Sequence, residues 1–356
     1  EVGVGCRGED GEPVAWWAAV KINSGSDYVI IDSKQRSHGL RDPDGGRTLA
    51  DANNGNALAE TLRQVYGGSE TELGVRASAP DAQGFVLFND QDPNGKQSAS
   101  HAHAKGVIAF SDEGVEGEGS GFWLIHSAPK FPPFQADGYA GYPDFASKYG
   151  QSFLCLSFTS LKHLDEAVRA QHWNNPQVYD THVPEALASS LPNTAALAAG
   201  LPEPPAEAIH FDISVGLPDA RYASEDFTVF AKSRHWARFL YEEAVEPFFG
   251  EGFFWETWMN GVNPDETFCS GDASGHRYDS VNIRRVSVGA GREFKETQDH
   301  SKWGVSLGHK KHVVCIGDIN RQQHQNLRGG GTVCKEDRDM WTAFRGLIVE
   351  ADKCPE

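Results

Sequence analysis

Two His-x-Lys pairs are the parts of this chain whose residue types and spacing could do chemistry. The segment "HAK" contains His103 and Lys105, and "HSK" contains His300 and Lys302. On an extended strand, residues two apart point to the same face, so each pair would project an imidazole and an ammonium together. If the pairs meet, one neutral imidazole can attack phosphorus, the other can protonate the departing oxygen, and the lysines can neutralise the non-bridging oxygens. The pairs therefore indicate phosphodiester cleavage, and the alternative is two unrelated surface pairs among the 14 histidines.

Polar side chains follow each pair at the end of an apolar run. The run "FWLI" leads into His126 and Ser127, with Lys130 shortly after, and "VVCIG" leads into Asp318 and Asn320. Functional residues are commonly found on loops where strands end. We therefore expect these five residues to support the two pairs.

The charge distribution limits the partners that this chain can bind. The formal net charge is −18, which is unfavourable for contact with phosphates at neutral pH. Residues 276–328 differ from the rest of the chain, because they contain more Lys and Arg than Asp and Glu. Protonation of all histidines at about pH 5 would remove most of the net negative charge of the whole chain. An anionic partner is thus acceptable under acid conditions, although a solvated basic face without a partner is the alternative.

Cysteines and apolar runs bear on the compartment. The six cysteines are widely spaced and form no C-x-x-C pair, which favours three disulfides and an oxidising compartment over six buried thiols. No apolar run approaches the length of a membrane span, so we expect a soluble protein that does not bind a membrane. The chain begins at Glu1 without an apolar leader, and we expect an export signal to be absent or already removed.

Two blocks of mixed strand and helix patterns organise the chain. Short apolar runs predict strands, and apolar residues at helical spacing predict helices. In the first block we expect strands at 14–22, 27–32, 85–90, 105–110, 121–127 and 152–158, and helices at 56–66 and 161–172. An Ala- and Pro-rich stretch, 186–208, is typical of a surface connector. In the second block we expect strands at 226–232, 252–259, 278–288 and 312–320, and helices at 235–249 and 340–353.

The repeated pattern favours one pseudo-symmetric unit over two separate domains. We expect a single catalytic domain over 1–356, with a first half 1–165 that carries His103 and Lys105 and a second half 210–356 that carries His300 and Lys302, joined by a connector over about 166–209. The fold class is mixed α/β.

Several segments resemble those of a known family. They are "VLFNDQ", "HAKGVIAF", "GFWLIHSAPKFPP", "YGQSFLCLSF", "DHSKWGVS", "CIGDINRQ" and "RGGGTVC", and they closely resemble segments of the deoxyribonuclease II family, acid endonucleases related in fold to the phospholipase D superfamily. The resemblance runs from Cys6 to the terminal helix and is weakest in the connector. It implies two pseudo-symmetric α/β sandwich halves with the active site between them.

The resemblance also implies an activity and roles for the candidate residues. Family members cut double-stranded DNA at acid pH without a metal or other cofactor and leave 3′-phosphate and 5′-hydroxyl ends, through what superfamily analogy suggests is a phosphohistidine. The matching motifs place His103 as the nucleophile and His300 as the acid, although the two roles could be reversed. Lys105 and Lys302 complete the motifs, and His126 would orient or relay protons.

Three further expectations follow from the resemblance. The family's cysteine pattern pairs Cys6 with Cys155, Cys269 with Cys354, and Cys315 with Cys334, which supports an exported protein, secreted or periplasmic in a microbe or lysosomal in a eukaryote. Lys130 stands where the family usually has Asn, so its role is in doubt. A single site cuts one strand, so a cut through both strands of a duplex needs either two encounters or a homodimer, and we favour the homodimer.

Other functions remain open at this stage. The same fold could act on a phospholipid or a protein–DNA adduct, or it could bind DNA without cutting it. The triplet His101, His103, Lys105 could belong to a zinc hydrolase, but the lysine would repel a cation, and we expect His101 to face solvent.

Overall fold

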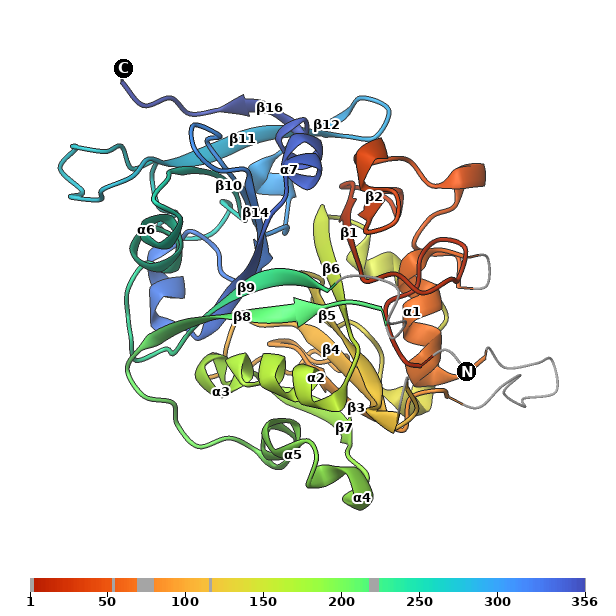
Figure 1. The fold of residues 1–356 in the computed structure, drawn as a ribbon. Helices are drawn as coiled ribbons and strands as arrows, with labels where there is room; N and C mark the ends of the chain where they lie inside the picture. The colour runs from red at the N-terminus through yellow and green to blue at the C-terminus, as the bar shows by residue number, and fades with distance from the viewer. Residues whose placement is uncertain (1–2, 53–54, 69–79, 115–116, 218–223, 356) are drawn as a thin grey trace.

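The computed structural model describes residues 3–52, 55–68, 80–114, 117–217 and 224–355, and Figure 1 shows the arrangement of its strands and helices. Two β-sheets dominate the molecule. Each strand that carries a continuous apolar run is buried on both faces, which is why such runs do not alternate with polar residues. Most of the expected strands are confirmed, with shifts of a few residues at their ends.

The first sheet has the order β2-β1-β6-β5-β4-β3-β7 within the described residues, and every neighbouring pair is antiparallel. Its strands are β1 (Trp16–Lys21), β2 (Tyr28–Asp32), β3 (Gly84–Phe88), β4 (Gly106–Ser111), β5 (Ser120–His126), β6 (Gln151–Phe158) and β7 (Val178–His182). Helix α1 (Ala57–Tyr66) covers its outer face, where the Asn56 side chain caps the helix by accepting from the Ala59 N–H.

The second sheet has the order β12-β11-β10-β13-β14-β15-β9-β8, with β16 paired to β11. Its strands are β8 (Ala208–Val215), β9 (Glu225–Lys232), β10 (Phe253–Glu256), β11 (Ser280–Val288), β12 (Arg292–Lys295), β13 (Trp303–Ser306), β14 (Val313–Gly317), β15 (Gly330–Glu336) and β16 (Ile348–Ala351). A π-helix over Tyr241–Val245, continued by α6 (Glu246–Phe249), covers its outer face. Only β10 and β11 run parallel among the pairs described.

One apolar core fills the space between the two sheets. In β5, Trp123 and Ile125 face this core, whereas Phe122 and Leu124 face α1 on the other side. The helices α2 (Leu161–Val168) and α7 (Arg338–Arg345) also contribute to the shared core. The order of layers is thus helix, sheet, sheet, helix, and the loops at the sheet ends carry the polar residues.

Several segments differ from the sequence expectations: the strands β8, β12, β13 and β15 are not among those expected, and the helix expected over 235–249 begins only at residue 240. The expected connector holds regular structure: β7 pairs with β3, and helices α3 (Ala170–Asn174), α4 (Glu185–Ala188) and α5 (Pro192–Ala199) follow α2. Asp165 of α2 accepts hydrogen bonds from the backbone of α5, which ties this segment to the body of the protein. The expected terminal helix over 340–353 is wrong in its second half, because the chain turns at Gly346 and continues as β16.

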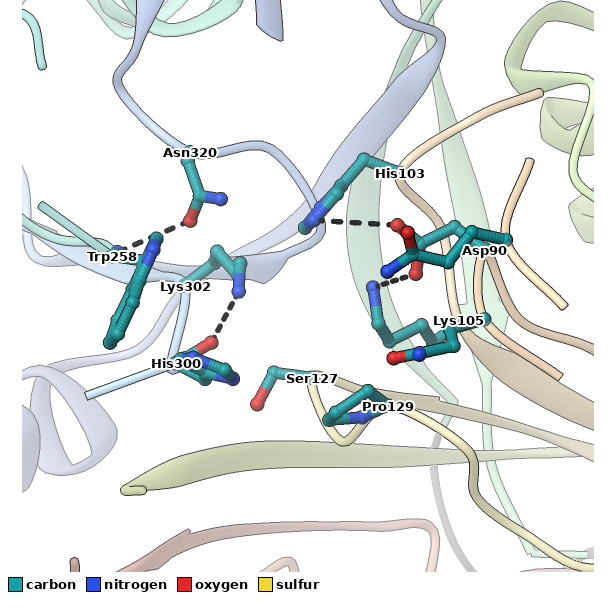
Figure 2. A pocket seen from close by; sticks show the side chains of 11 residues that line it. Asp90, His103, Lys105, Ser127, Pro129, Trp258, His300, Lys302 and Asn320 are labelled. Carbon is teal, nitrogen blue, oxygen red and sulfur yellow. Dashed lines mark hydrogen bonds and ion pairs between the residues drawn. The ribbon is translucent and has the colours of Figure 1, made fainter. Parts of the chain in front are cut away.

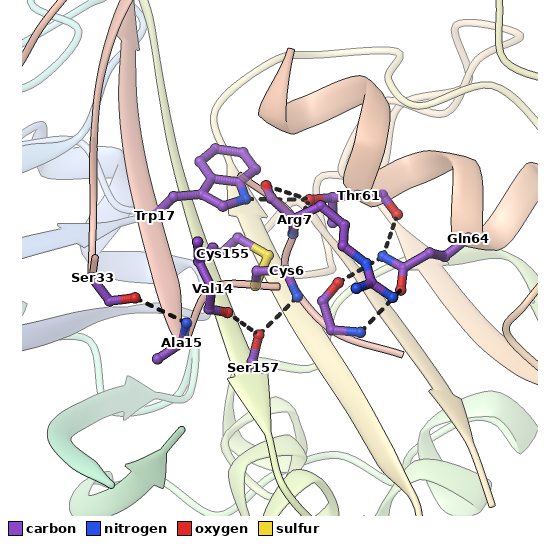
Figure 3. Close-up of a disulfide and its surroundings, with 11 residues drawn as sticks. Cys6, Arg7, Val14, Ala15, Trp17, Ser33, Thr61, Gln64, Cys155 and Ser157 are labelled. Carbon is purple, nitrogen blue, oxygen red and sulfur yellow. Dashed lines mark hydrogen bonds between the residues drawn. A yellow bond between two sulfur atoms is a disulfide. The ribbon is translucent and has the colours of Figure 1, made fainter. Parts of the chain in front are cut away.

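Three disulfides are present, with the pairing that the resemblance implies. Cys6 joins Cys155 of β6 with a Cα–Cα distance of 5.9 Å, and Figure 3 shows how Ser157 supports the same N-terminal segment. The other pairs are Cys269 with Cys354 and Cys315 with Cys334. Among the described residues no helix is long and apolar enough to cross a membrane.

Candidate active site

A cavity of about 190 Å³ lies where loops from both sheets meet, and it brings the two His-x-Lys pairs together (Figure 2). Predicted residues that line it are His103, Lys105, His300, Lys302, Ser127 and Asn320. Residues that the sequence analysis missed are Asp90, Gln91, Gln97, Pro129 and Trp258. The lining combines several cationic groups with a single carboxylate.

The strands deliver these side chains from their ends. Lys105 immediately precedes β4, and Lys302 immediately precedes β13, so each pair lies in the segment that leads into a strand rather than on the strand itself. The expectation of pairs within strands is therefore wrong by a few residues. Ser127 follows β5 and Asn320 follows β14, as expected for functional residues at strand ends.

The ring of His103 is held in one orientation and one tautomer. Its Nδ1 lies 2.7 Å from the carbonyl oxygen of Asp318. A carbonyl oxygen can only accept, so Nδ1 carries the proton and Nε2 keeps its lone pair. Burial, reinforced by the charge of Lys105, holds the pKa of His103 well below its usual value. Burial thus favours the neutral form of the ring, in which Nε2 carries the lone pair.

Asp90 is the carboxylate of the cavity. Its Oδ1 lies 2.6 Å from the Nζ of Lys105, and its Oδ2 lies 3.2 Å from an Arg328 nitrogen and 3.7 Å from His103 Nε2. Burial alone would raise the pKa of Asp90, but the charges of Lys105 and Arg328 outweigh it and hold the pKa below its usual value. Asp90 is ionised and sits where positive charge on His103 would be stabilised.

Aromatic rings enclose His300. Tyr149 stacks on it with centroids 4.3 Å apart and planes 10° apart, and Trp258 meets it edge-on at 4.2 Å. Burial, reinforced by Lys302, lowers the pKa of His300 to about 2. The stacked face of Tyr149 favours the charged form, so an anion in the cavity together with this ring would raise the pKa again.

Lys302 and Asn320 lie on the same side of the cavity as His300. The Nζ of Lys302 donates to the His300 carbonyl at 2.5 Å, and burial lowers the pKa of Lys302 to about 7. The Oδ1 of Asn320 accepts a hydrogen bond from the backbone N–H of Trp258 at 3.2 Å. Figure 2 shows the amide nitrogen of Asn320 turned toward the His103 side of the cavity. Asn320 thus offers a donor to a bound oxygen.

Three of the predicted residues do not line the cavity. His126 is 1% exposed and packs against Phe131 and Phe153, with its pKa lowered by burial to about 3. Asp318 contributes its carbonyl, while burial raises the pKa of its carboxyl to about 7. Lys130 has a φ of 56°, a backbone conformation that Asn adopts more readily than most residues. This backbone conformation accounts for the Asn that the family usually has where this chain has Lys130.

The glycines of the segment "RGGGTVC" and the side chain of His101 lie outside the cavity lining. The Gly329–Gly331 run enters β15, where a Cβ on Gly331 would lie 2.1 Å from the Phe230 carbonyl oxygen, so close packing explains this glycine. His101 does not line the cavity, and its Nδ1 lies 2.5 Å from Ser98 Oγ. Within the described part of the chain, no group of three His, Cys, Asp or Glu side chains could hold a metal ion.

Three residues that sequence reasoning missed contact the His-x-Lys pairs: Asp90, Tyr149 and Trp258. Asp90 ends the segment "VLFND", so the argument that singled out Ser127 and Asn320 at strand ends would also have found it. Tyr149 begins the segment "YGQSFLCLSF" and Trp258 lies in a loop without a motif, and only the folded chain places both against His300.

Fold and site together define a two-sheet α/β protein with a cationic pocket suited to a phosphate-containing anion. A family model described as Deoxyribonuclease II matches residues 5–354, and the chain belongs to this family.

Curated relatives cover nearly the whole chain. Plancitoxin-1 of Acanthaster planci is 30% identical over 99% of this chain and 92% of its own. Deoxyribonuclease-2-alpha of Rattus norvegicus is 31% identical over 98% of this chain and 94% of its own. Cell-death-related nuclease 7 of Caenorhabditis elegans is 29% identical over 98% of this chain and 88% of its own length. A solved polyphosphate kinase from Porphyromonas gingivalis overlaps 65% of this chain and 30% of its own at 12% identity, but its TM-score of 0.29 carries no argument.

Proposed function

We propose that this protein is an endonuclease that cuts DNA phosphodiester bonds at acid pH through a covalent phosphohistidine. The observation that carries the proposal is the bond between His103 Nδ1 and the Asp318 carbonyl, which leaves Nε2 as an unprotonated nucleophile facing the cavity. Membership of the deoxyribonuclease II family supports DNA as the substrate.

The first step forms a bond between His103 Nε2 and phosphorus. The bond from phosphorus to the 5′-oxygen breaks, and that oxygen takes a proton from His300. Lys105 and Lys302 stabilise the non-bridging oxygens, and Asp90 stabilises the positive charge that develops on the His103 ring.

The second step releases the phosphate. Neutral His300 removes a proton from a water molecule, the water oxygen bonds to phosphorus, and the bond to His103 breaks with its electron pair returning to Nε2. The products are a 3′-phosphate and a 5′-hydroxyl. In this scheme the protein's own cations fill the role that a metal ion has in other nucleases, because Lys105 and Lys302 occupy the positions next to the phosphate.

The strand orders support a pseudo-symmetric pair of halves. The order β2-β1-β6-β5-β4-β3-β7 parallels β8-β9-β15-β14-β13-β10-β11. In this correspondence β4 matches β13, and each is preceded by one His-x-Lys pair. The halves differ at the margin, where β3 and β7 are antiparallel but β10 and β11 are parallel. We take the whole chain as one catalytic domain of the phospholipase D type.

The experiment uses supercoiled plasmid and purified protein at about pH 5 in the presence of a chelator. Wild type should nick and linearise the plasmid and leave 3′-phosphate ends that block polymerase extension until a phosphatase removes them. His103→Ala and His300→Ala should abolish cutting, whereas His38→Ala, at an exposed position outside the cavity, should not. Activity lost in chelator, or 5′-phosphate ends, would contradict the proposal. Phospholipid vesicles in the same assay separate DNA from lipid as the substrate.

Compartment and assembly are further parts of the proposal. Three disulfides fit an exported or lysosomal protein. One pseudo-symmetric site cuts one strand, so we propose a homodimer for cuts through both strands. Light scattering at the assay concentration tests this, and a monomer that cuts both strands in one encounter would contradict it.

A further inference from the structure

Two lysines outside the cavity are buried in an unusual way. Lys232, the last residue of β9, is 0% exposed. Its Nζ donates to three backbone carbonyls, those of Gln325 at 3.2 Å, Asn326 at 2.9 Å and Arg328 at 2.6 Å. No carboxylate pairs with it among the residues that the structure describes. The ammonium therefore serves to hold the backbone of a loop.

Lys21 does the same in the first sheet. It is the last residue of β1 and is also 0% exposed. Its Nζ donates to the carbonyls of Ile22 and Gly25, both at 2.6 Å, and of Ser147 at 2.9 Å. The two lysines lie at matching places, because Lys21 is in register with the first residue of β6 and Lys232 with the first residue of β15.

Each lysine holds the loop that orients a histidine of the other sheet. The loop held by Lys232 ends at Gly329, whose carbonyl accepts from the His103 N–H at 2.9 Å. The loop held by Lys21 ends at Gly150, whose carbonyl accepts from the His300 N–H, also at 2.9 Å. In both loops the lysine donates to a carbonyl three residues before the glycine, which is that of Ser147 in one loop and that of Asn326 in the other.

Side chains of the same loops also contact the site. Tyr149 stacks on His300. Arg328 pairs with Asp90 and donates to the carbonyls of His101 and Ala102, which lead directly into His103. Each histidine is thus oriented by the sheet that does not carry it.

Stability alone does not account for these lysines. An ammonium that is buried without a paired carboxylate destabilises the fold, and an apolar side chain of similar shape would avoid that cost. Burial lowers the pKa of both lysines to about 7, although Asp299 and Asp27 oppose the shift at Lys21. Both groups therefore keep their full charge only in acid, the condition in which the site is proposed to work.

We infer that Lys21 and Lys232 are positioning residues that hold the two loops in place, Lys21 acting on His300 and Lys232 acting on His103. The inference rests on the proposed roles of the two histidines. It gives the two lysines different consequences, because one histidine acts as the acid and the other as the nucleophile.

The test uses Lys21→Met and Lys232→Met, with Lys162→Met at an exposed position of α2 as the control. On a DNA oligonucleotide we expect both buried variants to lower kcat about 10- to 100-fold with little change in KM, since a misplaced group loses about this much. The control should match wild type.

A second substrate separates positioning from general damage. In thymidine 3′-(p-nitrophenyl phosphate) the departing nitrophenolate needs no proton. In the first turnover, before water attacks the phosphohistidine, Lys21→Met should therefore recover most of its rate of nitrophenolate release, because His300 is not needed as an acid in that step, whereas Lys232→Met should remain slow, because the nucleophile His103 is still required. Equal losses on both substrates in both variants would overturn the inference in favour of a purely structural role.

Further variants keep the inference testable if a lysine variant does not fold. Tyr149→Leu should reproduce the recovery on the nitrophenyl substrate, and a loss that persists there would contradict action through His300. If the two histidine variants are inactive but both lysine variants are as fast as wild type, the positioning role is wrong and the proposed function stands. If the histidine variants remain active, the proposed function itself has failed.

Discussion

Replacement of Asp90 by Asn tests whether a carboxylate stabilises the positive charge on the nucleophile. The change keeps the shape of the side chain and removes the charge that lies 3.7 Å from His103 Nε2. Two unit charges at this separation interact by about 4 kcal/mol at the effective dielectric constant of about 20 that suits such sites. Roughly half of the charge is developed in the transition state, so the barrier should rise by about 2 kcal/mol, which is about 30-fold in kcat.

The same change should affect substrate binding in the opposite direction. Asp90 repels the phosphodiester, so Asp90→Asn should lower KM while kcat falls. Steady-state cleavage of a labelled oligonucleotide at about pH 5 measures both constants, and thermal unfolding checks that the fold is intact. Asp339→Asn, at an exposed position of α7, is the matched control. A kcat for Asp90→Asn within about threefold of wild type would refute this role for the carboxylate.

Three further predictions concern pH and stability. Burial lowers the pKa of Lys302 to about 7, so kcat/KM should fall as pH rises through 7, and Lys302→Arg, which keeps its charge, should move this fall to higher pH in the same assay. Burial and then the charge of Asp299 raise the pKa of Glu256 in the folded protein. The stability that protonated Glu256 contributes is therefore complete in acid and is lost as pH rises through this raised pKa. Glu256→Gln should flatten the fall of Tm between pH 5 and 8. Removal of the Cys6–Cys155 disulfide by Ala substitution opens a loop with a sequence separation of 149 and should lower the unfolding free energy by about 5 kcal/mol, measured by denaturant titration.

The sequence predicts every core strand of the first sheet, but it misses β13 and β15 in the middle of the second sheet as well as strands at the sheet margins. Runs such as "FWLI" in β5 are apolar on both faces, and no other element of that length explains them. The strand β7 has the sequence "VYDTH" and is only partly buried, so its pairing with β3 depends on tertiary contacts. The strand β16 reads as a continuation of α7, because "LIVEA" also fits helical spacing.

The candidate site shows the same division. His103, Lys105, His300 and Lys302 could be predicted because their chemistry is complementary and the pattern occurs in both halves. The orientation of each histidine could not, because it depends on backbone carbonyls, and a carbonyl at Gly150 or Gly329 leaves no trace in a motif. Local pattern finds the candidate side chains, whereas long-range contacts decide how they are held.

The long-range contacts also reconcile two opposite demands on the histidines in acid. In the proposed mechanism one ring must be neutral to attack, and burial and Lys105 favour that form of His103. The other must carry a proton, yet burial and Lys302 lower the pKa of His300. A bound phosphodiester brings the negative charge that His300 lacks, while the stacked face of Tyr149 already favours a cation at that ring. His300 would therefore take up its proton together with the substrate, which makes acid necessary for the charged complex without silencing the nucleophile.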